Sequence, residues 1–407
     1  MTKDVFQQIK LIRSFKMKNV SKKSPSILLM IVLVGFPQIS ESIFTPVLPM
    51  ISQAFHVSAQ TAQLTMSTYF MAFAFGVLFW GWLSDQIGRR LTMLLGIGVY
   101  LFGNGGLLLA GHFSWLILAR LVQAFGASVG SVVTQTIMRE SFSGVRGAQV
   151  FAKVGAAMAL APALGPLIGG LVQTYFGYRQ VFSVLIMMAV GAILYAGACL
   201  PETRPAGVPA QVNIGAVTKR LLTDKKVWVY GAVISGINGI LFSYYAEAPF
   251  IFINHFHLST VQYGWLGLVL AAASILGAMT TNYGAPKFGA VMMAKIGLVL
   301  ALVGSLLLLV ASYYDQLLLM VILILIVFWG LNTTLPVVLN LALVGYEAVI
   351  GTASGLFSFG YYLAISALTY GMSLLHTGAI SRLPLYIVTI VAVMALWYGL
   401  VIRNNEV

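Results

Sequence analysis

Three charged side chains lie inside long apolar stretches of this sequence. Glu41 lies in PQISESIF, Arg120 in LILARLVQAF and Glu247 in YYAEAPF. An ionised group inside a bilayer costs about 2.5 kcal/mol or more, so it normally faces a cavity and takes part in function. A carboxyl group held away from water can take up a proton near neutral pH. We expect Glu41 to be the main proton carrier, Glu247 its reserve and Arg120 the electrostatic partner.

A second group of charges lies in a short turn, GWLSDQIGRR, between two apolar runs. Its charged and glycine residues are Gly81, Asp85, Gly88, Arg89 and Arg90. Glycine permits a sharp turn and a close approach of backbones. A helix N-terminus carries partial positive charge, so Asp85 placed against one would latch two parts of the protein together. Arg89 can hold Asp85, and Glu140 can pair with Arg89 or Arg139. We expect this group to be a gate.

The composition requires most of the surface to face lipid. Hydrophobic residues make up 59% of the 407 residues and charged residues 8%, whereas a soluble domain carries about 25% charged residues. The apolar runs are continuous and long enough to span a membrane as helices, unlike the alternating strands of a barrel. We expect an all-α integral membrane protein with twelve transmembrane helices, near residues 26–52, 60–83, 91–110, 114–140, 148–173, 179–200, 227–254, 260–284, 290–312, 316–344, 349–376 and 382–402.

Basic residues mark one face of this helix array. Seven of them lie in the first 25 residues, and most later Lys and Arg fall on the same face once the helices are counted. Positively charged loops stay in the cytoplasm, so we expect both termini to be cytoplasmic in a bacterial inner membrane. The net charge of +13 therefore reflects topology, and no separate basic domain suggests nucleic acid as a partner.

A long polar stretch, PETRPAGVPAQVNIGAVTKRLLTDKK, divides the helices into two sets of six, as in transporters built from two similar bundles. We expect a cytoplasmic basic tail at 1–25, an N-terminal six-helix bundle at 26–200, a cytoplasmic linker at 201–226, a C-terminal six-helix bundle at 227–402 and a cytoplasmic tail at 403–407. The turn NYGAPKFG in the second half aligns Gly289 with Gly88, but it has no counterpart of Asp85.

Other residue types argue against catalysis and ATP drive. The chain has one cysteine, Cys199, and neither a cluster of metal-binding side chains nor a phosphate-binding Gly-rich loop with Lys-Ser/Thr. The five histidines fall at the predicted outer face, where an imidazole suits the membrane interface. We expect no metal, no cofactor and no enzymatic activity. A channel is disfavoured because twelve non-repeating helices supply no ring of pore-lining residues.

Several motifs resemble those of the major facilitator superfamily. The turn fits the signature between spans 2 and 3 through Gly81, Leu83, Asp85, Gly88, Arg89 and Arg90. LILARLVQAFGASVG is similar to the span-4 motif through Arg120, Gln123 and Gly126, with Ala124 where glycine is usual. APALGPLIGG resembles the span-5 motif of antiporters through Gly165, Pro166, Gly169 and Gly170. Together with LPETRP, TPVLP and EAPF, these motifs most resemble the Bcr/CflA branch of twelve-span drug:proton antiporters.

The resemblance implies the major facilitator fold and further roles. Asp85 would latch onto the start of span 11, near Gly351, and close the cytoplasmic side. Pro166 would bend span 5 by removing a backbone hydrogen bond. Gly169 and Gly170 would then pack tightly, against span 8, and seal the proton path so that transport is antiport. Many relatives carry the span-1 acid one residue later, at the place of Ser42, so the equivalence of Glu41 stays open.

Aromatic and amide side chains on inward-facing helices form the candidate substrate pocket, namely Gln38, Phe44, Gln123, Tyr244, Phe357 and Tyr361. An apolar pocket with one or two buried charges suits lipophilic, often cationic compounds. The sequence therefore predicts a monomeric, proton-coupled exporter of drugs or small lipophilic metabolites. The alternative on the same fold is an importer of a small metabolite or siderophore.

Overall fold

The computed structural model describes residues 24–142, 144–204, 213–346 and 349–403, and the regular elements in these ranges are helices. In chain order they are α2 (Ile27–Ser42), η1 (Thr45–Val47), α3 (Leu48–Ala54), α4 (Ala59–Ile87), α5 (Arg89–Leu108), α6 (Phe113–Ser141), α7 (Gly144–Met158), α8 (Ala161–Phe176), α9 (Tyr178–Cys199), α10 (Ile214–Thr223), α11 (Lys225–Pro249), η2 (Phe250–His255), α12 (Thr260–Trp265), α13 (Gly267–Phe288), α14 (Ala290–Ala311), α15 (Leu317–Leu341), α16 (Ile350–Leu375) and α17 (Arg382–Arg403).

Within the described ranges, eleven helical segments are long and apolar enough to cross a membrane. The remaining expected span corresponds to α16, which has 26 residues but is rich in Gly, Ser, Thr and Tyr. This helix packs against α4 on one side and α11 on the other. Its polar composition therefore suits a helix that faces the interior rather than lipid, and it explains why hydropathy alone finds eleven segments instead of twelve.

Several expected spans are broken helices. The first span passes from α2 through η1 to α3, and Pro46 and Pro49 stand in the first turns of the two later pieces, where the missing N–H is tolerated. Span 5 consists of α7 and α8, with the interruption at Ala159 and Leu160. Pro166 lies inside α8. The bend expected at Pro166 stays a prediction, and the interruption of the helix at Ala159 and Leu160 was not foreseen from the sequence.

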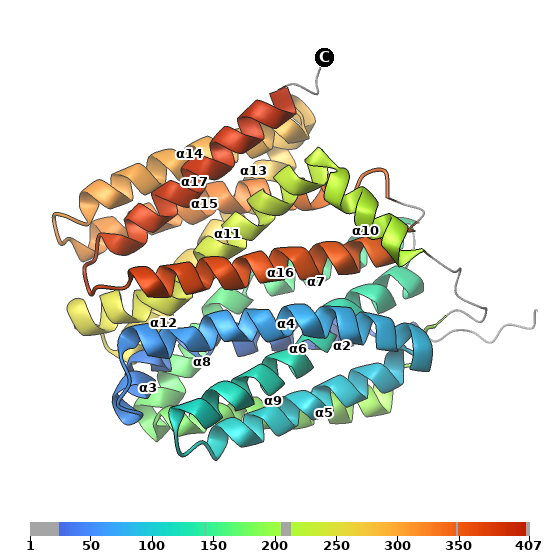
Figure 1. Cartoon of the computed structure of the whole chain (residues 1–407), viewed down its shortest axis with the longest axis horizontal. Coiled ribbons are helices and arrows are strands. Elements are labelled where there is room, and N and C mark those ends of the chain that lie inside the picture. The colour runs from blue at the N-terminus through green and yellow to red at the C-terminus, as the bar shows by residue number, and fades with distance from the viewer. Residues whose placement is uncertain (1–23, 143, 205–212, 347–348, 404–407) are drawn as a thin grey trace, which may run out of the picture.

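The helices form two groups that meet along α4 and α16 (Figure 1). Helices α2 to α9 make the first half, and helices α11 to α17 make the second. We call the end of the molecule that carries α10 the linker end, and the opposite end, with α3 and α12, the far end. At the far end α8 of the first half packs against α12 and α13 of the second.

The described parts of the expected linker, 201–204 and 213–226, belong to different halves. Its helix α10 begins after the cap residue Asn213, whose side chain accepts from the amide of Ala216 at 3.0 Å. Val217 and Leu221 of α10 pack around Tyr346, before α16. The Tyr346 hydroxyl donates to Asp224 at 3.0 Å, and Arg220 donates to the Gly345 carbonyl at 3.0 Å. Helix α10 is therefore fastened to the second half.

The aligned glycines of the two halves adopt the same backbone conformation. Gly88, between α4 and α5, has φ 98° and ψ 162°, and Gly289, between α13 and α14, has φ 82° and ψ 153°. Both positions need glycine because a side chain is strained at positive φ. Their surroundings differ, because a Cβ at Gly88 would collide with Glu202 while one at Gly289 would meet nothing within 4 Å.

Candidate functional site

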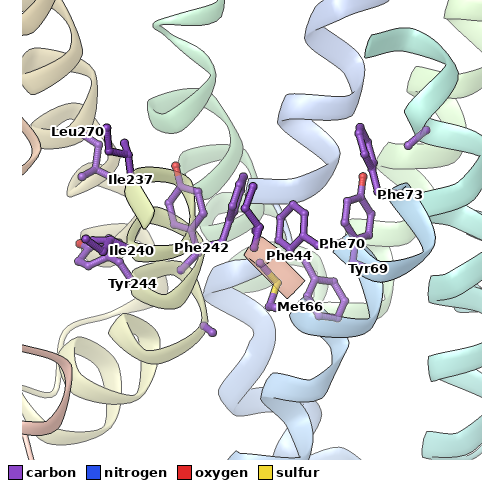
Figure 2. Close-up of a cluster of buried hydrophobic side chains, with 14 of the residues drawn as sticks. Phe44, Met66, Tyr69, Phe70, Phe73, Ile237, Ile240, Phe242, Tyr244 and Leu270 are labelled. Carbon is purple, nitrogen blue, oxygen red and sulfur yellow. The ribbon is translucent and has the colours of Figure 1, made fainter. Parts of the chain in front are cut away.

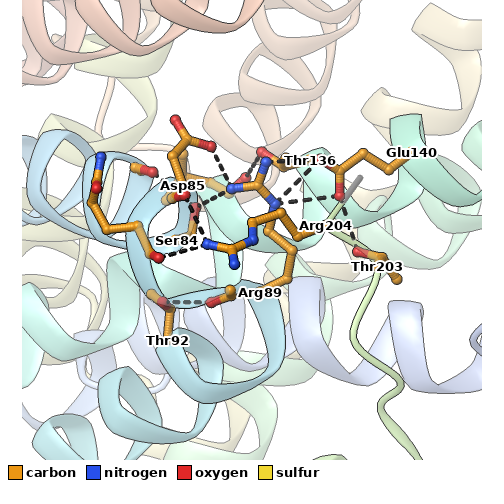
Figure 3. Close-up of polar contacts among 12 residues, drawn as sticks. Ser84, Asp85, Arg89, Thr92, Thr136, Glu140, Thr203 and Arg204 are labelled. Atoms are coloured by element: carbon orange, nitrogen blue, oxygen red, sulfur yellow. Dashed lines mark hydrogen bonds and ion pairs between the residues drawn. The ribbon is translucent and has the colours of Figure 1, made fainter. Parts of the chain in front are cut away.

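Arg89 lies at the centre of a polar cluster at the linker end (Figure 3). Its guanidinium is buried, with 7% of the side chain exposed. It donates to Asp85 at 2.5 Å, to Glu140 at 2.7 Å and to the hydroxyl of Ser84 at 2.8 Å. The expected pairs of Arg89 with Asp85 and Glu140 are therefore formed. Glu140 uses Arg89 rather than Arg139 as its partner.

The segment after α9 completes this cluster, which the sequence analysis did not foresee. Glu202 accepts from the backbone amides of Arg89 at 2.9 Å and Arg90 at 3.2 Å, so its carboxylate caps the N-terminus of α5. The Thr203 hydroxyl donates to Glu140 at 2.9 Å. Arg204 donates to the last carbonyls of α4, including that of Gln86 at 2.5 Å. These three residues lie in LPETRP, a stretch that in the sequence indicates a family resemblance but not these contacts.

The other residues of the turn, Arg90, Gly88 and Gly81, make different contacts from those of Arg89. Arg90 donates to the Gly197 carbonyl near the end of α9, at 2.6 Å. Gly88 makes the expected sharp turn. Gly81 does not bring two backbones close, because a Cβ there would sit 3.5 Å from the side chain of Val132, which is an ordinary contact. The expectation of a close approach at Gly81 is therefore wrong.

Within the described residues, which leave out 347–348 directly before α16, the expected latch between Asp85 and the start of α16 is not formed. The Asp85 side chain is 55% exposed and its carboxylate is bonded to Arg89. A Cβ at Gly351 or Gly355 of α16 would meet nothing within 4 Å. At the far end, by contrast, a Cβ at Gly170 or Gly264 would press on the backbone of the other half. The two halves are thus joined at the far end and separated near Asp85.

Arg120 is buried in the first half without a carboxylate partner. Its guanidinium carbon lies 4.3 Å from the ring centre of Phe44 and 4.2 Å from that of Tyr69, so two aromatic faces enclose the charge. Figure 2 shows these two rings within the buried hydrophobic cluster. It donates to Gln123 at 2.5 Å, and Gln123 donates in turn to Asn104 at 2.5 Å. Among the described residues no ion pair within 4 Å joins Arg120 to an acid.

Glu41 lies near the middle of the first span, in the last turn of α2, and is 2% exposed. Within the part of the chain that the structure describes, neither its Oε1 nor the Nε of Arg120 has a hydrogen-bond partner. Electrostatic interactions reach from Glu41 to Arg120, and to the tyrosines Tyr69, Tyr245, Tyr361 and Tyr362. The carboxyl group therefore lies within electrostatic range of tyrosines from both halves.

The six pocket candidates divide into two groups. Phe44 and Gln123 already contact Arg120, the first through its ring and the second through a hydrogen bond. Tyr244 is buried against Phe328, with ring centres 5.6 Å apart. Three candidates have partly exposed side chains, namely Gln38, Phe357 and Tyr361. The last two contact each other on one face of α16, with ring centres 5.8 Å apart. These three are the better candidates for substrate contact.

The glycines of the span-5 motif create close helix contacts, with a partner that was only partly expected. A Cβ at Gly165 would collide with Ser42, and one at Gly169 would collide with the carbonyl of Ile43. Both glycines thus let α8 pack tightly on span 1. Gly170 alone meets span 8, at Thr260. The expectation that Gly169 packs on span 8 is therefore wrong, because this glycine faces span 1.

Glu247 lies near the far end of α11 and is bonded across the two halves. It accepts from the Gln63 amide of α4 at 2.5 Å, and its oxygens lie 2.9 Å from Nδ1 of His376, after α16. Gln63 was not singled out from the sequence, because its partners lie 184 and 313 residues away. His376 was noted only as an interfacial histidine.

Comparison with known proteins identifies the family. Residues 30–369 match the Major Facilitator Superfamily. A transporter of unknown substrate from Rickettsia bellii is 33% identical over 394 residues, which cover 93% of this chain and 97% of that protein. A chloramphenicol resistance protein of Pseudomonas aeruginosa is 28% identical, covering 86% of this chain and 84% of its own length. The crystal structure of a D-xylose-proton symporter superposes with a TM-score of 0.73 at 15% identity, covering 90% of this chain and 96% of the symporter.

The chain therefore belongs to the major facilitator superfamily, and it is a multi-pass membrane transporter rather than an enzyme. Multidrug resistance protein D of Escherichia coli and a bicyclomycin resistance homolog of Haemophilus influenzae also match, at 24% and 25% identity over shorter stretches. These relatives confirm the resemblance to the Bcr/CflA branch. The solved structures establish the fold alone.

Proposed function

We propose that this transporter exports lipophilic small molecules in exchange for protons, by alternating access between its two halves. The linker end is assigned to the cytoplasm, since the basic linker and both termini belong there by the positive-inside rule. The conformation described above is then inward-facing, with the outer end closed. The resistance proteins among the relatives support efflux as the direction of transport.

The observation that carries this proposal is that two buried ionisable groups, Glu41 and Arg120, form no ion pair within 4 Å among the described residues. A buried ionisable group without a partner is unfavourable unless it is neutral or another charge compensates for it. Glu41 can satisfy this condition by holding a proton in one conformation and releasing it in the other. Arg120 cannot lose its charge under ordinary conditions, and its aromatic enclosure keeps it in place. The pair is therefore suited to couple a proton to a conformational change.

The partly exposed side chains of Gln38, Phe357 and Tyr361 support a substrate class. Phe357 and Tyr361 of α16 offer aromatic faces, and Gln38 of α2 offers an amide. Such a surface binds apolar bodies and favours cations over anions when Glu41 is ionised. We therefore assign lipophilic, often cationic, compounds to this site.

Inverted membrane vesicles test the proposal directly. With the lumen acidified, the wild type should accumulate a lipophilic cationic dye, or chloramphenicol, against its gradient. Glu41→Gln should abolish this uphill accumulation, while Glu41→Asp, which keeps the acid, should retain part of it. Accumulation only in right-side-out vesicles with acid outside would favour the importer instead. A reporter fused after Val407 that is active only outside the cell would contradict the assigned orientation.

A further inference from the structure

Glu247 and His376 form a buried acid–imidazole pair at the far end, and Gln63 joins this pair to the other half. The side chains of Gln63 and Glu247 are almost completely buried, and that of His376 is 15% exposed. Nδ1 of His376 lies 2.9 Å from both carboxylate oxygens, and Phe250 packs edge-on against its ring at 5.4 Å. Gln63 donates through Nε2, while its Oε1 has no partner, so the amide contributes a donor to the cluster.

The pair is isolated from other charges on the surrounding elements. His255 of η2 is paired with Asp315, and Arg382 of α17 donates to Thr377. Tyr245 lies two residues before Glu247 on α11, and His56 is exposed between α3 and α4. None of these four groups is bonded to Glu247 or His376 in the described structure. Among the described residues, Gln63 is therefore the one further side chain that is hydrogen-bonded to the pair.

We propose that Gln63, Glu247 and His376 form an outer lock, and that Glu247 with His376 takes up an external proton when this lock opens. The inference rests on the proposed alternating-access function and adds a second proton site to it. Helix α4 belongs to the first half, while α11 and α16 belong to the second. Opening the far end must therefore pull Gln63 away from the carboxylate and admit water.

The chemistry of the lock links its opening to proton uptake. In the closed state the Glu247 carboxylate accepts hydrogen bonds from both Gln63 and His376, and this arrangement favours the ionised acid. A proton on the carboxylate would compete with these donors. Once Gln63 has left and water has entered, the acid–imidazole pair can hold an additional proton. By reciprocity, a higher external proton concentration must favour the open lock.

The same linkage gives the proton a direction. The lock cannot reform fully while the extra proton stays on the pair, so the proton must either return outside or pass inward to Glu41. Transfer to Glu41 restores the ionised Glu247 and its bond from Gln63. Closure of the outer end is then favoured only after the proton has reached Glu41. The outer end therefore rarely closes while the proton is still on Glu247 and His376.

Distance measurements between spin labels test the lock in substrate-free protein. In a Cys199→Ser background, cysteines replace Gln60 on α4 and Ala379 before α17, both exposed at the far end. In lipid nanodiscs the ratio of open to closed far ends should rise about tenfold from pH 8 to pH 5.5, as for one proton bound about ten times more tightly in the open state. Gln63→Met and Glu247→Gln should each raise this ratio about tenfold at pH 8, because a charge-assisted bond is lost.

Two further variants separate the lock from the proton site. His376→Asn keeps a donor near the place of Nδ1 but cannot titrate, so the far end should stay closed at pH 8 and the acid response should move at least one pH unit lower. Ser366→Ala is the matched control, since Ser366 of α16 donates to the Ser67 carbonyl of α4 at 2.7 Å without any charge. It should shift the ratio of open to closed far ends while preserving the pH response.

Each part of the proposal can be contradicted separately. Ratios within twofold of the wild type for both Gln63→Met and Glu247→Gln would exclude the lock. An unchanged pH response in Glu247→Gln and His376→Asn would exclude the proton site. Glu41→Gln should keep the pH response of the label distances even though it stops uphill transport. A loss of proton-driven transport with an intact label response therefore counts against the proposed function alone.

Discussion

The carboxylate of Glu202 accepts hydrogen bonds from the backbone amides of Arg89 and Arg90, across 113 and 112 residues of sequence. These amides are the free donors of the first turn of α5, where a negative charge is stabilised by the helix dipole. The contact fastens the segment after α9 to the turn that carries Asp85. The proposed gate would therefore include the end of the sixth span.

Acidification should weaken this contact. Burial disfavours the ionised form of Glu202, but backbone amides, led by that of Arg89, outweigh it and hold the pKa below the usual range. Because the pKa is lowered on folding, the stabilisation is present above the unfolded value near 4.3 and is lost as the pH falls below it. Glu202→Gln should lower stability at pH 7 by about 1 kcal/mol, and the difference from wild type should shrink toward pH 3, as thermal unfolding in detergent can show.

Gly88→Ala should act through the same contact. The new methyl group is strained at positive φ, at a cost of about 1–2 kcal/mol, and it displaces the carboxylate of Glu202. In the double variant, Glu202→Gln should therefore add almost nothing to Gly88→Ala. The control is Gly289→Ala, which has the same backbone strain but no neighbour, and which should combine additively with Glu202→Gln. Additivity in both pairs would contradict the proposed collision.

Asp85→Asn should separate the gate from stability. The Asp85 carboxylate is more than half exposed, so its pair with Arg89 contributes at most about 1 kcal/mol to stability. We expect near-normal substrate binding but at least a tenfold loss of turnover, since the proposed latch needs the charge of Asp85 opposite α16 to close the linker end. Glu140→Gln, at the buried side of Arg89, should instead lower the unfolding temperature clearly. Wild-type transport by Asp85→Asn would reduce the turn to a topology signal.

Gly169→Ala tests the contact between span 5 and span 1. Its methyl group would press against the carbonyl of Ile43, which cannot rotate away as a side chain can. We expect α8 to shift and the protein to lose about 1–3 kcal/mol, with slower transport. The matched control is Gly191→Ala in α9, which has open space and should be neutral or slightly stabilising. Equal unfolding temperatures for the two variants would show that this approach is looser than described.

The sequence predicted most spans and the centre of the gate, and it could do so for physical reasons. Long apolar runs specify helices whatever their neighbours are, and Asp85 and Arg89 lie one helical turn apart. Contacts between distant segments were missed. Nothing local in Gln63 or Glu202 reveals a partner more than a hundred residues away, because the lateral arrangement of helices depends on how all their surfaces fit. The interruption of span 5 at Ala159 and Leu160 was missed for a similar reason, whereas Pro166 lies within α8.

The divided linker has a practical consequence. Arg204 and the residues before it are fastened to the first half, whereas α10 is fastened to the second through Tyr346 and Arg220. A gene split between Arg204 and Asn213 would therefore encode two polypeptides that each retain the end contacts of their own bundle. Co-expression of the two pieces should reconstitute a working carrier, and the split offers a natural place to insert a reporter domain.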